Sequence, residues 1–184
     1  MIPESEKIYK DNRFHEKRVA WTVDFVRANL NPGAKILDLG PKNILSQALQ
    51  NDGYIVENAN SQDLDVDYDC VKKEGFDAFT SFEVFEHLVS PLPLLKAVQA
   101  PLLITSVPLS LWFARAYRGN LEEDPFDEHY HEFEPWQFEL LLRKSRWSAI
   151  RKELHASFDK RSFGIRPILR RFYPRYLIVA ATRS

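Results

Sequence analysis

The segment KILDLGPKN, residues 35 to 43, constrains the fold more than any other part of the sequence. A short apolar run there ends in Asp38, Leu39 and Gly40 and gives way to a turn, and a helical pattern resumes at Ile44. In parallel-sheet proteins, an apolar strand that ends in this way delivers a nucleotide-like ligand to a helix N-terminus. The pattern therefore predicts a strand, a turn and a helix, with a ligand site between them.

Short apolar runs and amphipathic segments alternate along the rest of the chain. This alternation predicts an α/β protein with a mostly parallel sheet and helices on its faces. Between Asn60 and Phe76 the chain is too short and too acidic for a helix plus a strand, so we expect one crossover trimmed to a loop and a short strand near 64–68. The expected helices are 14–30, 44–50, 91–99 and 135–144, and the other expected strands are 35–39, 54–58, 76–82, 102–107, 148–154 and 175–183.

A chain of 184 residues has the size of one domain, and we expect a single domain over 1–184. Within it, we expect 1–30 to form an N-terminal helical segment and 108–134 to form a cover over the ligand site. The one cysteine, Cys70, excludes an internal disulfide, and no apolar stretch has the length of a signal peptide core or a membrane span. These features predict a cytoplasmic protein without a transmembrane segment.

Charge is unevenly distributed although the net charge is only −1. Acidic residues dominate from 120 to 139, whereas from 143 onward basic residues face only Glu153 and Asp159. This basic C-terminal third predicts an anionic partner, either the phosphates of RNA or an anionic lipid, or else a solvated edge that complements the acidic segment. The basic residues are Arg143, Lys144, Arg146, Arg151, Lys152, Lys160, Arg161, Arg166, Arg170, Arg171, Arg175 and Arg183.

A second landmark, FDAFTSFEVFEHL at 76–88, follows the first at a distance suited to one intervening strand unit. Together the two stretches resemble the class I S-adenosylmethionine (SAM) dependent methyltransferases, over about 31–107. The resemblance implies a Rossmann-like fold that binds SAM at the carboxyl ends of the strands. It also implies an enzyme that transfers a methyl group to oxygen or nitrogen of an unidentified small-molecule or RNA acceptor.

The same resemblance implies which residues hold SAM. Asp38 would lie near the amino group of the methionine moiety, Gly40 would let the backbone approach closely, and Asn60 stands where the family has an acid on the ribose hydroxyls. Leu64 or Asp65 would lie near the adenine. The implied cofactor-binding set is Asp38, Gly40, Asn43, Asn60, Leu64, Ser81 and Phe82.

Two departures from the family pattern motivate a different class of function. Pro41, Lys42 and Asn43 follow the only glycine of a loop that usually has two or three, and Asn60 replaces a carboxylate. A neutral hydrogen bond to the ribose is about half as strong as the charge-assisted one. The alternative is therefore a noncatalytic methyltransferase-like domain that serves as a binding or scaffold subunit.

Glu83, Glu86 and His87 have spacing that would place them near one face of a helix. Two carboxylates and an imidazole can bind a divalent cation such as Mg²⁺ or Mn²⁺. The stretch resembles the Glu-x-x-Glu-His motif of small-RNA 2′-O-methyltransferases, in which a later histidine completes the metal site. DEHYHEFEPWQF at 127–138 resembles the second part, so the implied metal ligands are Glu83, Glu86, His87 and either His131 or His129.

Methyltransferases of small molecules share this stretch and use it to line the site without a metal. In that case His87, His129 or His131 could remove a proton from a substrate hydroxyl, because an imidazole titrates near neutrality. The candidate catalytic residues are therefore Glu83, Glu86, His87, His129 and His131. Aromatic residues also crowd 112–136, and they predict either a cover over an aromatic, lipid-like or stacked-base acceptor or a small satellite core.

Overall fold

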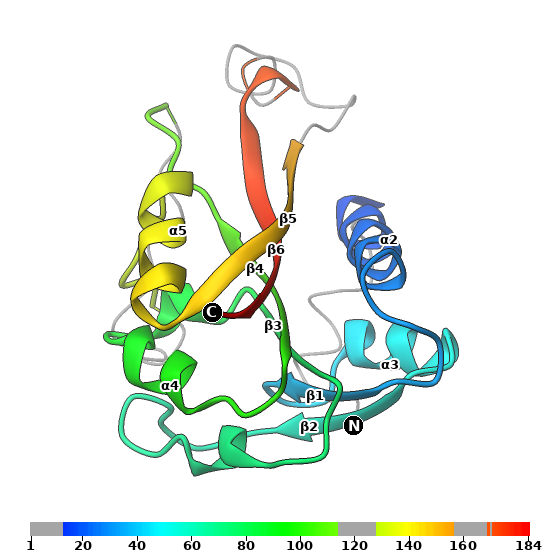
Figure 1. Ribbon diagram of the computed structural model, residues 1–184. Coiled ribbons are helices and arrows are strands. Elements are labelled where there is room, and N and C mark those ends of the chain that lie inside the picture. The colour runs from blue at the N-terminus through cyan, green and yellow to red at the C-terminus, as the bar shows by residue number, and fades with distance from the viewer. Residues whose placement is uncertain (1–12, 114–127, 157–168, 170) are drawn as a thin grey trace, which may run out of the picture.

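The computed structural model describes residues 13–113, 128–156, 169 and 171–184, and these residues form a six-stranded mixed sheet (Figure 1). The strand order is β2-β1-β3-β4-β6-β5. The first four are parallel, and β6 runs antiparallel between β4 and β5. The strands are β1 (Lys35–Leu39), β2 (Ile55–Ala59), β3 (Ala78–Phe82), β4 (Leu102–Pro108), β5 (Trp147–Ala156) and β6 (Pro174–Arg183).

Helices cover both faces of the sheet (Figure 1). One face carries α2 (Arg13–Arg27) and α3 (Ile44–Asn51), and the other carries α4 (Pro91–Ala97) and α5 (Pro135–Lys144). Two 3₁₀ helices, η1 (Asp69–Lys72) and η2 (Phe85–His87), belong to the connections. None of the helices in the described ranges has the length and apolar character needed to cross a lipid bilayer.

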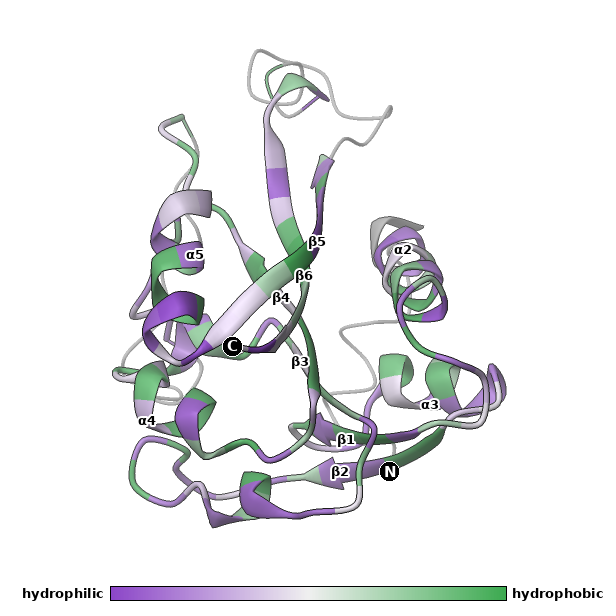
Figure 2. Ribbon diagram, viewed as in Figure 1, coloured by the Kyte–Doolittle hydropathy of each residue, from purple (hydrophilic) through white to green (hydrophobic). Residues whose placement is uncertain are grey.

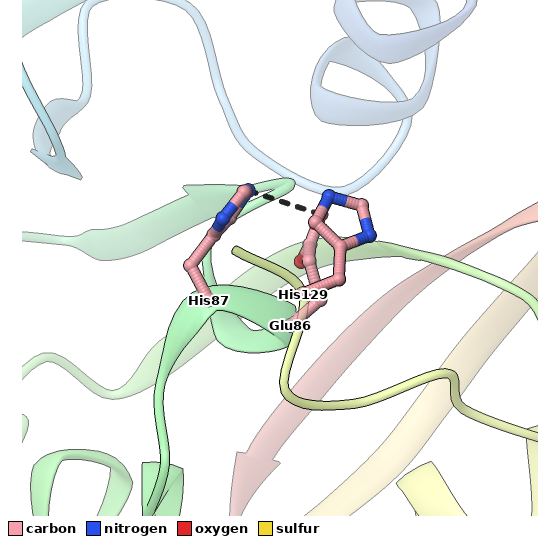
Figure 3. Close-up of side chains that lie close together, drawn as sticks. All are labelled: Glu86, His87 and His129. Atoms are coloured by element: carbon pink, nitrogen blue, oxygen red, sulfur yellow. Dashed lines mark ion pairs between the residues drawn. The ribbon is translucent and has the colours of Figure 1, made fainter. Parts of the chain in front are cut away.

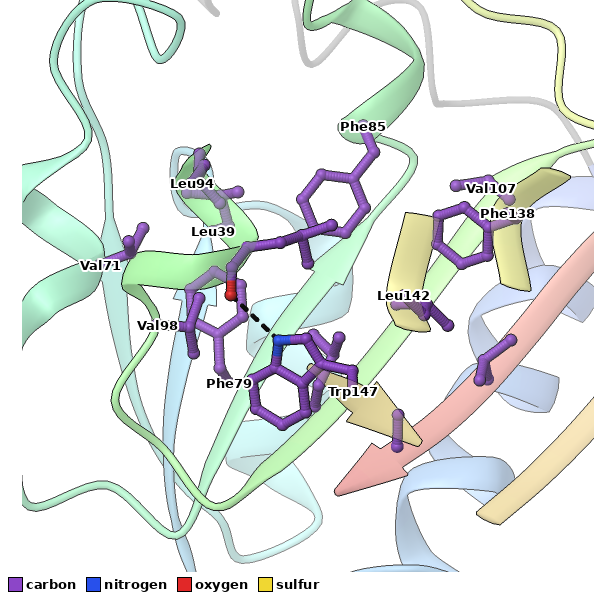
Figure 4. Close-up of a cluster of buried hydrophobic side chains, with 14 of the residues drawn as sticks. Leu39, Val71, Phe79, Phe85, Leu94, Val98, Val107, Phe138, Leu142 and Trp147 are labelled. Atoms are coloured by element: carbon purple, nitrogen blue, oxygen red, sulfur yellow. Dashed lines mark hydrogen bonds between the residues drawn. The ribbon is translucent and has the colours of Figure 1, made fainter. Parts of the chain in front are cut away.

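Two hydrophobic cores result from the alternation of side chains along the buried strands. On β1, Leu37 and Leu39 pack toward α4 and α5, whereas Ile36 packs toward α2 and α3. Apolar residues accordingly run along the strands where helices cover them (Figure 2). In the α4–α5 core, the fully buried Trp147 donates its indole N–H to the carbonyl of Leu95 at 3.0 Å, which satisfies its one polar group (Figure 4).

The strand order reverses between β1 and β3, and this reversal positions the candidate site. From β1 the chain continues to β2, which lies on one side of β1, and it later forms β3 and β4 on the other side of β1. Connections that diverge from neighbouring parallel strands leave a crevice at the carboxyl ends of those strands, which is where ligands bind in open α/β sheets. Here Gly40 follows β1 and Glu83 follows β3, so the two landmarks of the sequence lie at the carboxyl ends of neighbouring parallel strands.

The expected helices and strands are confirmed to within a few residues, with one exception. The prediction of a short strand near 64–68 is wrong. Residues 64–66 form a turn that is followed by η1, and β2 is the edge strand of the described sheet. Aspartates there bond to the nearby backbone, with Asp63 accepting from the N–H of Asp65 and Asp67 accepting from the N–H of Asp69. Such local bonds stabilise turns instead of a strand ladder, so the crossover is trimmed to a loop with one 3₁₀ turn.

Candidate functional site

The turn that follows β1 is built around Gly40, whose φ of +113° favours glycine over any other residue. Its N–H donates to the carbonyl of Ala59 at 2.8 Å, and its carbonyl accepts from the side-chain amide of Asn58 at 3.2 Å. A methyl group added at Gly40 would have no neighbour within 4 Å. The turn therefore borders open space, as a backbone cradle for a ligand must.

Asn43 fixes the other end of this turn as the N-cap of α3. Its side-chain oxygen accepts from the N–H groups of Leu45 at 2.9 Å and Ser46 at 3.0 Å, and its amide donates to the carbonyl of Pro41 at 3.2 Å. Ser46 accepts in return from the N–H of Asn43 at 3.4 Å, which completes a capping box. A turn with a single glycine is thus anchored at both ends.

Asp38 lies at the centre of a buried polar network. Thr80 donates to one carboxylate oxygen at 2.7 Å, while Ser46 at 2.7 Å and Asn58 at 3.2 Å donate to the other. Burial raises the pKa of Asp38, and the three hydrogen bonds oppose that rise. The resemblance implied that this carboxylate approaches the cofactor, but in the structure both of its oxygens are bonded within the protein.

Sequence reasoning missed the three partners of Asp38. Asn58 and Thr80 are its neighbours in register on β2 and β3, and Ser46 reaches it from the first turn of α3. The sequence did contain a signal for this network. Asp38, Asn58 and Thr80 are polar residues in three short strands, and a parallel sheet aligns their positions. Aligned polar residues of this kind predict a buried hydrogen-bond network.

The remaining predicted cofactor residues occupy several environments. Asn60 is exposed just after β2, and Leu64 is half-buried against the α4–α5 core. Phe82 is half-buried against the α2–α3 core. Ser81 is fully buried, and its hydroxyl has no hydrogen-bond partner among the residues described. Asp65 accepts from the N–H groups of Val89 and Ser90, both at 2.8 Å, and so fastens the loop after β2 to the start of α4.

Glu83 lies at the carboxyl end of β3 with a positive φ of +57°, so it does not share a helical face with Glu86 and His87. Its carboxylate accepts from the hydroxyl of Ser106 at 3.0 Å and pairs with Arg18 of α2 at 3.2 Å. Burial raises the pKa of Glu83, and the guanidinium of Arg18 opposes this rise most strongly. Glu83 therefore links α2 to β3 and β4.

Glu86, His87 and His129 converge beside η2 (Figure 3), and each offers a possible ligand atom within 4.8 Å of the others. The Nε2 atom of His87 lies 3.9 Å from Oε1 of Glu86, and the two imidazole rings meet edge to face at 4.5 Å between centroids. Glu86 is only 1% exposed, and its Oε2 has no hydrogen-bond partner within the described part of the chain. The pKa of Glu86 is raised well above its ordinary value. Burial is the larger cause, and repulsion by the carboxylate of Glu83 is the next.

Backbone contacts bring residues 128–131 to this cluster. The N–H groups of Tyr130 and His131 donate to the carbonyl of Glu86 at 2.8 and 3.1 Å, and Nδ1 of His87 lies 3.2 Å from the carbonyl of Glu128. The ring of His131 stacks on Phe133, and its Nε2 lies 3.3 Å from the carbonyl of Val89. His129 rather than His131 thus joins the potential ligand cluster.

The aromatic segment contributes both core and surface. Phe133 is buried and packs on Phe138 of α5 at 5.2 Å between ring centroids. Trp112 is 77% exposed, and it meets Phe113 and Tyr173 edge to face at the ends of β4 and β6. Two aromatic residues of the segment 112–136, Tyr117 and Phe126, lie outside the described residues. Four basic residues of the C-terminal third also lie outside them: Lys160, Arg161, Arg166 and Arg170.

A separate open groove of about 560 Å³ lies at the amino-terminal ends of the strands, opposite to the turn at Gly40. Lys35, Ile55, Glu57 and Phe76 are among the residues that line it. It is distant along the strands from the turn at Gly40, because Lys35 and Ile55 begin β1 and β2.

Comparison with protein-family models found no match, and comparison with curated proteins found none either. Several solved structures share the fold. One belongs to the complex between the Haloferax volcanii Trm112 methyltransferase activator and a putative methyltransferase, with a TM-score of 0.58, 13% identity and coverage of 91% of both chains. Another, a SAM-dependent methyltransferase from Methanosarcina mazei, has a TM-score of 0.58 and 13% identity, covering 86% of this chain and 96% of that one.

A third, the magnesium protoporphyrin IX methyltransferase of Synechocystis PCC 6803 with bound S-adenosylhomocysteine (SAH), has a TM-score of 0.54 and 17% identity. The alignment covers 97% of this chain and 91% of that one. At these identities the likeness concerns the fold. The chain therefore has the Rossmann-like fold of SAM-dependent methyltransferases.

Proposed function

We propose that this protein is a SAM-dependent methyltransferase that acts on oxygen or nitrogen of a small-molecule or RNA acceptor. The observation that carries the proposal is the anchored turn at Gly40, which borders open space at the strand-order reversal. The fold shared with methyltransferases, one of them with bound SAH, supports the same conclusion. The glycine-poor loop was the reason to consider a noncatalytic domain. That reason is weaker now, because the side chains of Asn43 and Asn58 anchor the loop.

In this proposal the backbone of turn 40–43 and the residues at the ends of β2 and β3 would hold SAM, which would supply an electrophilic methyl group. The main tasks of the protein would then be to position the acceptor and to exclude water. Glu86 and His87 lie in η2, which follows β3, and the side chain of His129 lies beside them. There they would orient the acceptor and take the proton from its hydroxyl or amine.

Calorimetric titration with SAH tests the proposal, and two glycine variants sharpen it. Gly40 and Gly53 both have positive φ, at +113° and +94°, and neither has a neighbour within 4 Å of an added methyl group. Both alanine substitutions therefore strain the backbone, but only Gly40→Ala alters the proposed cradle. We expect the wild type and Gly53→Ala to bind SAH and Gly40→Ala to bind at least about tenfold more weakly. No binding by the wild type would reject the proposal and favour the noncatalytic domain.

A metal-assisted RNA ribose 2′-O-methyltransferase is the second candidate. It is favoured by the convergence of Glu86, His87 and His129, and by Oε2 of Glu86, which has no hydrogen-bond partner among the described residues. One carboxylate and two imidazoles form a donor set that suits Mn²⁺ better than Mg²⁺. Because burial keeps the pKa of Glu86 high, a cation would have to displace a proton, and its affinity would rise with pH.

Titration with Mn²⁺ tests this candidate through three histidine variants. His129→Ala removes a member of the cluster, His131→Ala removes the neighbouring histidine that stacks on Phe133, and His155→Ala changes a histidine that stacks on Trp21 of α2. We expect about a tenfold or greater loss of Mn²⁺ affinity for His129→Ala alone. Equal losses for His129→Ala and His131→Ala, or no Mn²⁺ binding by the wild type, would count against it.

A further inference from the structure

The amide nitrogen of Asn58 contacts three acceptors that belong to three different segments. It lies 3.2 Å from the carboxylate of Asp38 at the end of β1, 3.2 Å from the carbonyl of Gly40 in the turn, and 3.1 Å from the hydroxyl of Ser46 in α3. The Ser46 hydroxyl donates its own hydrogen to Asp38 at 2.7 Å, so its oxygen remains able to accept from Asn58. The two N–H hydrogens of Asn58 are thus shared among three acceptors, and this one side chain on β2 connects the strand, the turn and the helix.

The contact with Gly40 determines the orientation of the rest of the turn. Gly40 is already held through its N–H, which donates to Ala59, so a second bond at its carbonyl fixes the peptide plane that joins it to Pro41. Proline has a fixed φ and no N–H. The N–H of Asn43 donates to Ser46, so the main-chain donor of the turn that can face a ligand is that of Lys42, and its direction depends on that plane.

We propose that Asn58 is a positioning residue for the cofactor, which holds the Gly40 carbonyl and the start of α3 in the arrangement that lets turn 40–43 bind SAM. This inference rests on the proposed function, and it assigns to Asn58 a role distinct from ligand contact. It also explains how a loop with one glycine can keep a fixed shape: side-chain bonds from Asn58 and Asn43 restrain the backbone from both ends.

Asp38 offers a matched control, because Thr80 and Asn58 bond to its two different oxygens. Thr80→Val removes a donor to Asp38 from the side of β3, and Thr80 has no contact with the turn among its described hydrogen bonds. Asn58→Leu removes a donor to the same carboxylate and also releases the Gly40 carbonyl. Both variants weaken the buried network, and only Asn58→Leu frees the turn.

The experiment measures SAH affinity by calorimetry and amide hydrogen exchange of residues 42–46 in the wild type and both variants. For Asn58→Leu we expect SAH binding at least about tenfold weaker and faster exchange in the turn, because a lost bond at a buried acceptor is of that size. For Thr80→Val we expect affinity within about twofold of the wild type despite a comparable loss of stability. If Asn58→Leu does not fold, Asn58→Ala removes the same donor without adding bulk or charge and serves in its place.

The outcomes separate the two proposals. If the wild type binds SAH and the Asn58 variants bind as tightly as Thr80→Val, the positioning role is overturned and the methyltransferase proposal stands. The same holds if exchange in the turn is unchanged. If the wild type binds no SAH, the methyltransferase proposal fails and the positioning role fails with it.

Discussion

Burial and hydrogen bonding act in opposite directions on Asp38. Removal from water disfavours its ionised form, and donors from Thr80, Ser46 and Asn58 favour it, with burial the larger effect. The folded protein therefore holds a proton on Asp38 to higher pH than the unfolded chain does. By linkage, this residue makes the free energy of unfolding decrease as pH rises from about 4 through the raised pKa.

Thr80→Val should increase that pH dependence. The valine removes a bond that favours the ionised carboxylate, so the pKa of Asp38 rises further and ionisation costs the folded state more. We expect Thr80→Val to lower the free energy of unfolding by about 1–3 kcal/mol at pH 7 and by less near pH 4. Urea denaturation at the two pH values measures this. An equal loss at both would show that Asp38 does not ionise in the folded protein.

Thr105→Val is the matched substitution on the neighbouring strand and should have the opposite effect. The hydroxyl of Thr105 is fully buried and has no hydrogen-bond partner among the described residues, so valine removes a desolvated polar group and keeps the shape. We expect the free energy of unfolding to stay the same or to rise by about 1 kcal/mol. A clear loss of stability in urea denaturation would indicate that the Thr105 hydroxyl has a bonded partner, such as an ordered water.

At the scale of elements, α2 is connected to the candidate site by an ion pair. Arg18 bridges 65 positions of sequence to reach Glu83 at 3.2 Å, and its guanidinium lies 5.7 Å from the ring centroid of Tyr176 on β6. Trp21, one turn further along α2, stacks on His155 of β5. The helix thus contacts both the strand end that carries Glu83 and the β5–β6 pair.

A double-mutant cycle on Arg18 and Glu83 should give a coupling energy of about 1–2 kcal/mol, because the pair is largely buried. Arg27 and Asp52 provide the control, since this pair joins α2 to α3 with a side-chain exposure of 52% for Arg27 against 29% for Arg18. We expect the exposed pair to couple more weakly. Urea denaturation of the single and double alanine variants measures both couplings, and a stronger coupling for Arg27 and Asp52 would contradict the assigned role of Arg18.

Elements with a clear hydrophobic period could be predicted from the sequence, and the acidic connection could not. The strand at 35–39 and the helix at 135–144 match the structure because their burial follows directly from local pattern. The strand expected near 64–68 fails because Asp63 and Asp67 bond to the local backbone, an effect that a count of apolar residues does not register.

At the scale of the whole molecule, strand order brings together residues that are far apart in the sequence. The sequence correctly predicts the sheet, and it places Gly40 and Phe82 at the carboxyl ends of two strands that the structure pairs as neighbours. Aligned polar positions indicate a network around Asp38, but they do not identify Asn58 as a donor to it. Nor does the sequence reveal that the side chain of His129, and not that of His131, lies beside the Glu86 carboxylate. These details depend on strand register and on the docking of residues 128–131.

The most direct test of the account is an SAH titration followed through the backbone amide resonances of isotope-labelled protein. We expect shifts at residues 38–43 except Pro41, which has no amide hydrogen, and at the residues that follow β2 and β3, at the carboxyl ends of the strands. We expect no shifts at Lys35, Ile55 and Phe76, which line the groove at the amino ends. No shifts at saturating SAH, or shifts confined to that groove, would contradict the claim that this chain binds a methyl-donor cofactor at Gly40.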